Sequence, residues 1–292
     1  MPPRDRESPE FRSRRRSGDD DDGRRRIDRP PLKVFPTTLW EYPSQHYDSA
    51  NLRTTHGAQA SREIRIEGDS VVGAGMQGDK EYVGATPSWV IWQLLTRYTR
   101  EGDTVVDPMC GSGTTLDVCR DLRRTGMGFD LNPQRQEIRK NDSRKLPLED
   151  SSVDFVFIDP PYSTHVEYSD DPRCIGRLDS GGEDHGAAYY RAMEQVIREI
   201  HRVLKARRYG ALYVSDSWRK RTGAKGGGGG EFMPIGFELF SILRKYMSPI
   251  DIISVVRGNR KLERGNWRKA AEDGNYFLRG FNYCFIFKKL DD

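Results

Sequence analysis

Cysteine and histidine are scarce in this chain, with four and five copies among 292 residues. Neither residue type shows the paired spacing that binds zinc, so we do not expect a metal centre. The cysteines are dispersed along the sequence. We expect them to be reduced thiols in a cytoplasmic protein: Cys110, Cys119, Cys174 and Cys284.

Long apolar stretches are absent as well. A helix that spans a bilayer needs about 20 consecutive apolar residues, and we find no such run and no signal-peptide pattern. We therefore expect no membrane partner. The net charge of +4 is small for a protein that binds nucleic acid, so the placement of the charges is more informative than their sum.

Charges of both signs crowd the N-terminus. Residues 1–30 hold ten arginines and eight acidic residues in blocks, with almost no apolar side chains. Such a composition favours disorder, because too little apolar surface is available for burial. Whether the segment touches phosphates or is only solvated stays open. We predict a disordered Arg/Asp-rich tail over 1–33, an N-terminal lid or extension over 34–84, and a folded domain over 85–292.

Apolar strand patterns alternate with helical patterns through the folded domain. This alternation indicates a parallel sheet with helices packed against it. The expected strands are 104–106, 126–130, 153–158, 209–215, 250–256 and 281–287. The expected helices begin near residues 86, 114 and 132 and then cover 189–205 and 237–246.

A glycine-rich turn follows the strand at 104–106. It reads Asp107-Pro108-Met109-Cys110-Gly111-Ser112-Gly113-Thr114-Thr115. Glycines allow positive φ angles and a close approach of the backbone to a ligand, and free N–H groups at the next helix start favour an anionic or polar partner. A nucleotide-triphosphate loop is disfavoured, because neither a Gly-Lys-Ser/Thr ending nor a six-residue dinucleotide fingerprint is present.

A second motif, Asp159-Pro160-Pro161-Tyr162, follows the strand at 153–158. In open α/β sheets, ligands bind at this edge, outside the carboxyl ends of the strands. The two prolines stiffen the turn and remove two backbone donors. An acid, a bare carbonyl and an aromatic face together suit a planar group that carries an exocyclic NH2. The tetrapeptide by itself is equally compatible with an ordinary rigid turn.

Three further segments keep a fixed order around these motifs. Thr86 and Pro87 have the pattern of a helix cap and first turn. Residues 126–130 form a short strand that ends in an acid and leads through Leu131 into Asn132-Pro133, a predicted helix start. Asn141-Asp142 then precedes an acidic turn. Taken singly, the acids Asp130 and Asp142 would be interpreted as solvated turn residues.

In this order, the segments resemble the S-adenosylmethionine-dependent methyltransferases that modify amino groups of nucleobases. The resemblance spans about 85–288 and implies a Rossmann-like class I methyltransferase fold, a mostly parallel, doubly wound α/β sheet with an antiparallel C-terminal edge hairpin. It implies S-adenosyl-L-methionine as the cofactor. The implied cofactor-binding residues are Pro87, Asp107, Pro108, Met109, Cys110, Gly111, Ser112, Gly113, Thr114, Thr115, Asp130, Leu131 and Asp142.

The catalytic residues that the resemblance implies are Asp159, Pro160, Pro161 and Tyr162. The Asp159 carboxylate and the Pro160 carbonyl would accept both hydrogens of the target amine, while Tyr162 would stack on a base flipped out of the duplex. The sulfonium supplies the electrophile, so neither a metal nor a covalent enzyme intermediate is needed. Positioning of the two substrates would account for most of the rate.

The predicted substrate is DNA, methylated at N6 of adenine, because aspartate at the first motif position is commoner in the adenine enzymes of this family. The alternatives are cytosine N4 in DNA, an amino group in RNA, and a non-catalytic subunit of a modification complex. No large target-recognition domain is evident, which keeps RNA open as the partner. We expect a monomer or a homodimer.

A basic segment near the C-terminus is a candidate for contact with nucleic acid. Residues 257–280 hold seven Lys/Arg against three acids, with aromatic residues between them, a composition typical of nucleic-acid surfaces. A charged face beside a core strand is the equal alternative. The predicted contacts are Arg257, Arg260, Lys261, Arg264, Trp267 and Arg268. Loops at 163–186 and at 219–232, which includes five successive glycines, are expected to be mobile and to face the substrate.

Overall fold

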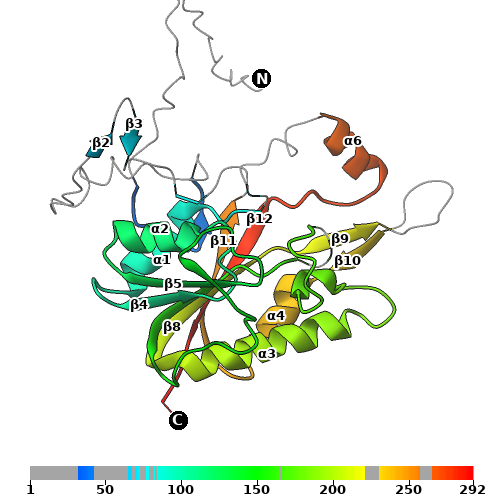
Figure 1. Ribbon diagram of the computed structural model, residues 1–292. Coiled ribbons are helices and arrows are strands. Elements are labelled where there is room, and N and C mark those ends of the chain that lie inside the picture. Colours follow the sequence, from blue (N-terminus) through cyan, green and yellow to red (C-terminus); the bar gives the residue numbers. More distant parts are fainter. Residues whose placement is uncertain are drawn as a thin grey trace, which may run out of the picture. The chain divides into compact units, whose positions relative to one another are not determined.

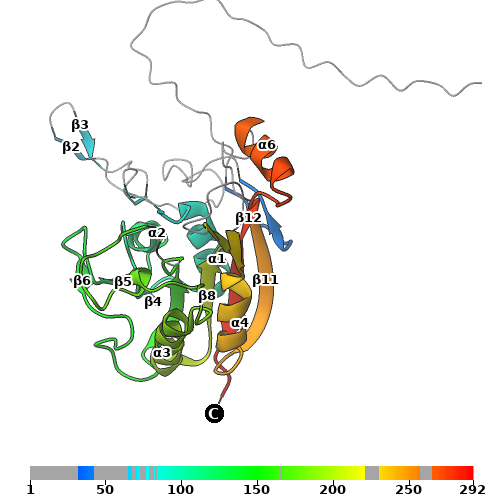
Figure 2. The same cartoon turned by 90° about the vertical axis from the view of Figure 1, so that its right-hand side faces the viewer.

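An eight-stranded mixed sheet runs through the centre of the structure, a computed structural model, in the order β1-β11-β12-β8-β7-β4-β5-β6 (Figure 1). Its parallel part comprises β4 (Thr104–Asp107), β5 (Thr125–Asp130), β6 (Ile138–Lys140), β7 (Val153–Ile158) and β8 (Leu204–Val214). β12 (Phe281–Lys288) is antiparallel to both β8 and β11 (Ser248–Val256), as Figure 2 shows. This arrangement confirms the predicted fold class.

The structure describes residues 32–42, 65–67, 70–72, 77–78, 82, 84–162, 164, 166–220, 230–256 and 265–291. The chain divides into two units, Met1–Pro30 and Pro31–Asp292, and every described residue belongs to the second. Most of the predicted tail, parts of the predicted lid and residues 221–229 of the glycine loop therefore lie outside the described residues.

The helices and short elements complete the described part of the chain. The helices are α1 (Ser88–Tyr98), α2 (Thr114–Asp121), α3 (Ala187–Val203), α4 (Ile235–Leu243), α6 (Gly265–Asp273) and the 3-10 helix η3 (Ile175–Arg177). β9 (Ser217–Lys220) and β10 (Gly230–Met233) form one antiparallel hairpin, and β2 (Arg65–Glu67) and β3 (Ser70–Val72) form another. No helix among the described residues is both long and apolar enough to cross a membrane.

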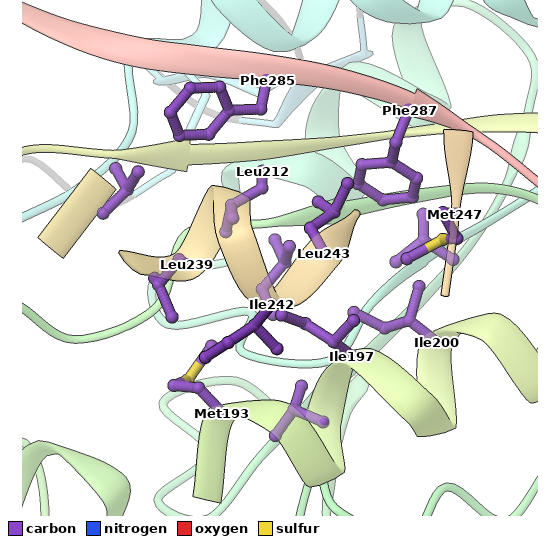
Figure 3. Close-up of a cluster of buried hydrophobic side chains, with 14 of the residues drawn as sticks. Met193, Ile197, Ile200, Leu212, Leu239, Ile242, Leu243, Met247, Phe285 and Phe287 are labelled. Atoms are coloured by element: carbon purple, nitrogen blue, oxygen red, sulfur yellow. The ribbon is translucent and has the colours of Figure 1, made fainter. Parts of the chain in front are cut away.

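Helices cover both faces of the sheet. Because side chains alternate along each strand, neighbouring residues enter opposite cores. Val156 of β7 faces the core under α3 and α4, whereas its neighbour Phe155 faces the core under α1. In Figure 1, α1 and α2 lie above the sheet and α3 and α4 lie below it. Figure 3 shows the lower core, where Ile197 of α3 and Leu239 of α4 pack toward Phe285. All six residues of β7 are buried, as expected for a central parallel strand.

The predicted helix after Asn132 is wrong, because residues 131–137 form bends and turns that lead directly into β6. Contacts with other parts of the fold take the place of helical hydrogen bonds in this segment. The backbone N–H of Asn132 donates to Asp130 at 2.8 Å and its side-chain amide donates to the Tyr168 carbonyl at 3.0 Å. Three residues later, the Arg135 guanidinium is paired with Asp117 of α2.

Two smaller expectations also need correction. The β11–β12 hairpin does not form the edge of the sheet, because β1 (Leu39–Trp40) pairs in parallel with the outer side of β11. Buried Trp40 fixes this position by packing against Trp89 of α1, with 6.3 Å between ring centroids. Thr86 does not cap α1; the residue at the cap is Pro87, and no side chain caps the helix.

Candidate active site

The carboxyl ends of β4 and β7 lie side by side at the point where the strand order reverses. From β4 the chain crosses by α2 to β5, and from β7 it crosses by α3 to β8 on the other side. Connections that diverge in this way leave a crevice outside the strand ends, the usual ligand site of open α/β sheets. A cavity of about 610 Å³ opens there, and both predicted motifs line it.

The glycine-rich turn wraps around the Asp107 carboxyl group. Gly111 and Gly113 have φ angles of +48° and +80°, which turn the chain sharply into α2. The Asp107 carboxyl accepts the Met109 N–H at 3.1 Å and the Thr115 hydroxyl at 2.5 Å. Burial raises the pKa of Asp107 to about 7; its two hydrogen bonds lower the value, and the carboxylates of Asp159 and Asp130 raise it.

Asp130 joins the end of β5 to the glycine turn. Its carboxylate accepts the backbone N–H of Gly111 at 2.9 Å and that of Asn132 at 2.8 Å. A carboxylate has about four lone-pair sites, so two backbone donors leave capacity for ligand hydroxyls. The strand-end acid therefore holds the loop in shape and lines the cavity at the same time.

Asp142 lines the same cavity and is paired with Arg144. The guanidinium contacts both carboxylate oxygens, at 2.6 Å for the closest pair. Burial would raise the pKa of Asp142, but the hydrogen bonds and the charge of Arg144 outweigh it and hold the pKa below its usual value. The acid is thus ionised and oriented by its neighbour two residues away.

The Asp159 carboxylate is held by one hydroxyl on each oxygen. The Tyr162 hydroxyl donates to Oδ1 at 2.7 Å and the Thr86 hydroxyl donates to Oδ2 at 2.5 Å. Behind the turn, the fully buried Tyr189 of α3 donates its hydroxyl to the Pro161 carbonyl at 2.8 Å. The predicted catalytic motif is therefore fixed by Thr86 and Tyr189 from outside and by the Tyr162–Asp159 hydrogen bond within it.

The structure gathers nearly all of the predicted site residues around one cavity. Of the predicted cofactor and catalytic residues, those that line it are Asp107, Pro108, Met109, Cys110, Gly111, Ser112, Thr114, Thr115, Asp130, Leu131, Asp142, Asp159, Pro160, Pro161 and Tyr162. Pro87 and Gly113 are not among the residues that line it; they begin α1 and α2. Trp267 and Arg268 lie in α6, exposed and away from the cavity lining. Arg257, Arg260, Lys261 and Arg264 lie outside the described residues.

Several lining residues escaped the sequence analysis. Tyr82 and Tyr168 stack at 6.3 Å between ring centroids and both line the cavity, although they come from segments on opposite sides of the two motifs. Burial, helped by the charge of Asp159, raises the pKa of Tyr168 to about 12. Thr86 was interpreted as a helix cap, and Tyr189 as an ordinary helix residue, because only the fold brings them to the motif. Ser215, Asp216 and Ser217 after β8 also line the cavity.

The strand order, the two covered faces and a cavity at the switch point define a Rossmann-like class I methyltransferase fold. Residues 7–141 match the family model of the DNA methylases that act on N6 or N4 amino groups. The matched residues include the glycine turn and end before Asp159. This match supports an amino-methyltransferase of that family, with S-adenosylmethionine as its cofactor.

One curated relative is the type II methyltransferase M.HpaI of Haemophilus parainfluenzae, 29% identical over 105 residues. The similar segment covers 36% of this chain and 25% of that relative, so the chain spans a quarter of its length. Solved structures of similar fold include an S-adenosylmethionine-dependent methyltransferase from Methanosarcina mazei, 15% identical over 68% of this chain and 98% of its own, with a TM-score of 0.42. Another is TrmN from Thermus thermophilus, 18% identical over 71% and 50%, with a TM-score of 0.45. Neither structure is close enough to bear on substrate.

The cavity has the chemical features that S-adenosylmethionine requires. Asp107 and Asp130 lie close enough for the Asp130 carboxylate to raise the pKa of Asp107. Such a concentration of negative charge favours a cationic ligand, and the cofactor carries an ammonium group and a sulfonium. Next to these acids, the N-terminus of α2 begins at Thr114, which lines the cavity, and a helix N-terminus favours a carboxylate. The donor and acceptor set therefore fits both ends of the methionine moiety.

Proposed function

We propose that this chain transfers a methyl group from S-adenosylmethionine to an exocyclic amino group of a base in DNA, with adenine N6 as the favoured target. The observation that carries the proposal is the Asp159 carboxylate, which lies at the end of β7, faces the same cavity as the glycine turn and is fixed by Thr86 and Tyr162. The family match of residues 7–141 supports a methylase of DNA.

The amino group of a nucleobase is a weak nucleophile, because its lone pair is delocalised into the ring. The Asp159 carboxylate accepts one N–H and the Pro160 carbonyl accepts the other, which favours a more pyramidal nitrogen. Thr86 and Tyr162 keep the carboxylate oriented, while Tyr189 anchors the carbonyl of the adjacent Pro161. Orientation of this kind lowers the barrier by reducing the entropy lost on reaching the transition state.

S-adenosylmethionine supplies an electrophilic methyl group when it is bound. The residues that would hold it are the glycine turn with Asp107 at the methionine end, Asp130 at the ribose and Asp142 at the adenine. All of these residues except Gly113 line the cavity. The stacked Tyr82 and Tyr168 line the same cavity and would cover part of a bound cofactor. Exclusion of water strengthens the electrostatic interactions inside the site.

The choice of adenine over cytosine rests on the first residue of the motif, where aspartate resembles the adenine enzymes of the family. Both bases present an NH2 beside a ring nitrogen, so the acceptor pair of Asp159 and Pro160 suits either. Cytosine N4 in DNA is the alternative, followed by an amino group in RNA.

The proposal is tested by mass spectrometry of nucleosides from DNA and RNA after incubation with the protein and methyl-labelled S-adenosylmethionine. We expect N6-methyladenine in DNA. Asp159→Ala should abolish transfer while leaving cofactor affinity, measured by calorimetry, nearly unchanged. Asp251→Ala, which removes an exposed acid from β11, is the matched control and should remain active. N4-methylcytosine alone would overturn the adenine assignment, and a mark confined to RNA would overturn the assignment to DNA.

A further inference from the structure

An exposed aromatic cluster lies on the β9–β10 hairpin. Trp218 and Phe232 face each other across the two strands, with 6.4 Å between ring centroids, and are 40% and 44% exposed. Tyr276 stacks on Trp218 at 5.8 Å and 24°, and the Arg279 guanidinium lies 4.7 Å from the centroid of the Phe232 ring. We call these four residues the aromatic platform. Adjacent exposed aromatic side chains often mark a binding surface.

The platform begins where the candidate active site ends. Ser215, Asp216 and Ser217 line the cavity, and Trp218 is the next residue along β9. On β10, Met233 follows Phe232 and is buried in the core. Asp216 is fixed by the Gly236 N–H at 2.9 Å and the Tyr283 hydroxyl at 3.0 Å, so the junction between cavity and platform is anchored on the sheet.

Two segments of basic composition supply the four platform residues. Residues 217–232 hold four Lys/Arg against one acid, and residues 257–280 hold seven Lys/Arg against three acids. The stacking of Trp218 on Tyr276 and of Arg279 on Phe232 joins one pair of platform residues to the other. The Arg279 Nε is buried and has no hydrogen-bond partner among the described residues. The Arg279 guanidinium and the basic composition of both segments favour a polyanion over a basic partner.

We propose that the aromatic platform binds unstacked nucleobases of the DNA strand beside the target base, with Trp218 and Phe232 as the stacking surfaces. The proposal rests on the proposed function, because it assigns the occupant from the DNA substrate. Stacking accepts any base, since every base has a π-face, and a positive surround holds the backbone. The platform thus supplies affinity next to the cavity without specifying a sequence.

The test compares wild type, Trp218→Leu and Trp218→Phe by fluorescence anisotropy on three labelled probes. The probes are a random-sequence single-stranded 20-mer DNA, the matching RNA pool, and inorganic polyphosphate, which has charge but no bases. We expect Trp218→Leu to lose about tenfold in DNA affinity and to bind polyphosphate like the wild type. Trp218→Phe should stay within about twofold of the wild type, which separates stacking from a folding defect. The control Ile250→Ala removes an equally exposed apolar side chain from the start of β11 and should change nothing.

Equal losses on DNA and polyphosphate, or no loss on DNA, would overturn the platform as a base-binding surface. A loss confined to RNA would overturn DNA as its occupant. Methyl transfer and cofactor affinity are measured on the same variants. If the wild type methylates DNA and Trp218→Leu binds DNA with normal affinity, the base-binding role of the platform is refuted and the proposed function stands. If the wild type methylates no nucleic acid but Trp218→Leu loses affinity for DNA and not for polyphosphate, the proposed function is refuted and the base-binding role of the platform stands.

Discussion

At the scale of single residues, the carboxyl groups of Asp159 and Asp107 differ in their burial. Asp159 lies half-buried between two hydroxyl donors. Asp107 is 4% exposed, and burial raises its pKa to about 7. A buried carboxylate without a cationic partner is costly. Asp107 therefore favours the neutral form in an empty cavity, and a cationic ligand would favour the ionised form.

Thr86 gives the first prediction. Its hydroxyl contacts Asp159 and does not cap a helix, so we class it as a positioning residue. Thr86→Val keeps the shape of the side chain and removes the donor, and it should lower kcat by about tenfold with little change in the KM for S-adenosylmethionine. Thr86→Ser should restore most of the rate. Steady-state kinetics decide, and a valine variant with wild-type kcat would show that the hydrogen bond does not serve the reaction.

Asp107 gives a prediction on pH. Its pKa is about 7 in the folded protein and near the ordinary 3.8 in the unfolded chain, so the folded state binds more protons between these values. Stability should therefore fall as the pH rises through this window, by at most about 1.4 kcal/mol per pH unit. Asp107→Asn should flatten this dependence and weaken cofactor binding above pH 7. Thermal melts of both proteins between pH 5 and 8 provide the measurement, and parallel profiles would contradict the prediction.

At the scale of elements, the sequence predicts the structure where local pattern and tertiary packing agree. β7 is a mostly apolar run that leads into Asp159 and two prolines, and both its position and the cavity-lining position of the motif at its end were predictable. The helix expected after Asn132 failed, because hydrogen bonds from Asn132 and the pairing of Arg135 with Asp117 replace helical turns. The β9–β10 hairpin was missed, because the five successive glycines at 226–230 favoured a mobile loop over 219–232.

The junction of β5 with the glycine turn gives a prediction at this scale. Asp130 accepts the Gly111 N–H and so couples two strand ends, while also lining the cavity. Asp130→Ala should weaken cofactor binding by an order of magnitude or more, because charge-assisted hydrogen bonds worth roughly 1.5–3 kcal/mol are lost. Calorimetry with S-adenosylmethionine measures this effect. Asp251→Ala again serves as the control, and an unchanged dissociation constant for Asp130→Ala would remove this acid from the cofactor site.

At the scale of the whole molecule, the sheet joins segments from both ends of the described chain. β1 (Leu39–Trp40) pairs with β11, and β12 inserts between β11 and β8, so the C-terminal strand is internal. The buried Leu32 and Trp40 belong to the same core as α1. Stability should therefore depend on the chain from about residue 32 onward, whereas the motifs that hold the chemistry begin only at Thr86.

Two truncations test this division. Deletion of residues 1–30 should change the melting temperature by less than about 2 °C and leave methyl transfer intact, because the segment is rich in charge and has few apolar side chains to bury. Deletion of residues 1–42 also removes Leu32 and Trp40, which are 6% and 3% exposed, and exposes the outer edge of β11. Loss of a buried tryptophan costs about 3–5 kcal/mol, which corresponds to a drop of roughly 10 °C. Differential scanning calorimetry of both proteins makes the comparison. A large drop on removal of residues 1–30 alone would mean that the charged segment packs against the folded unit.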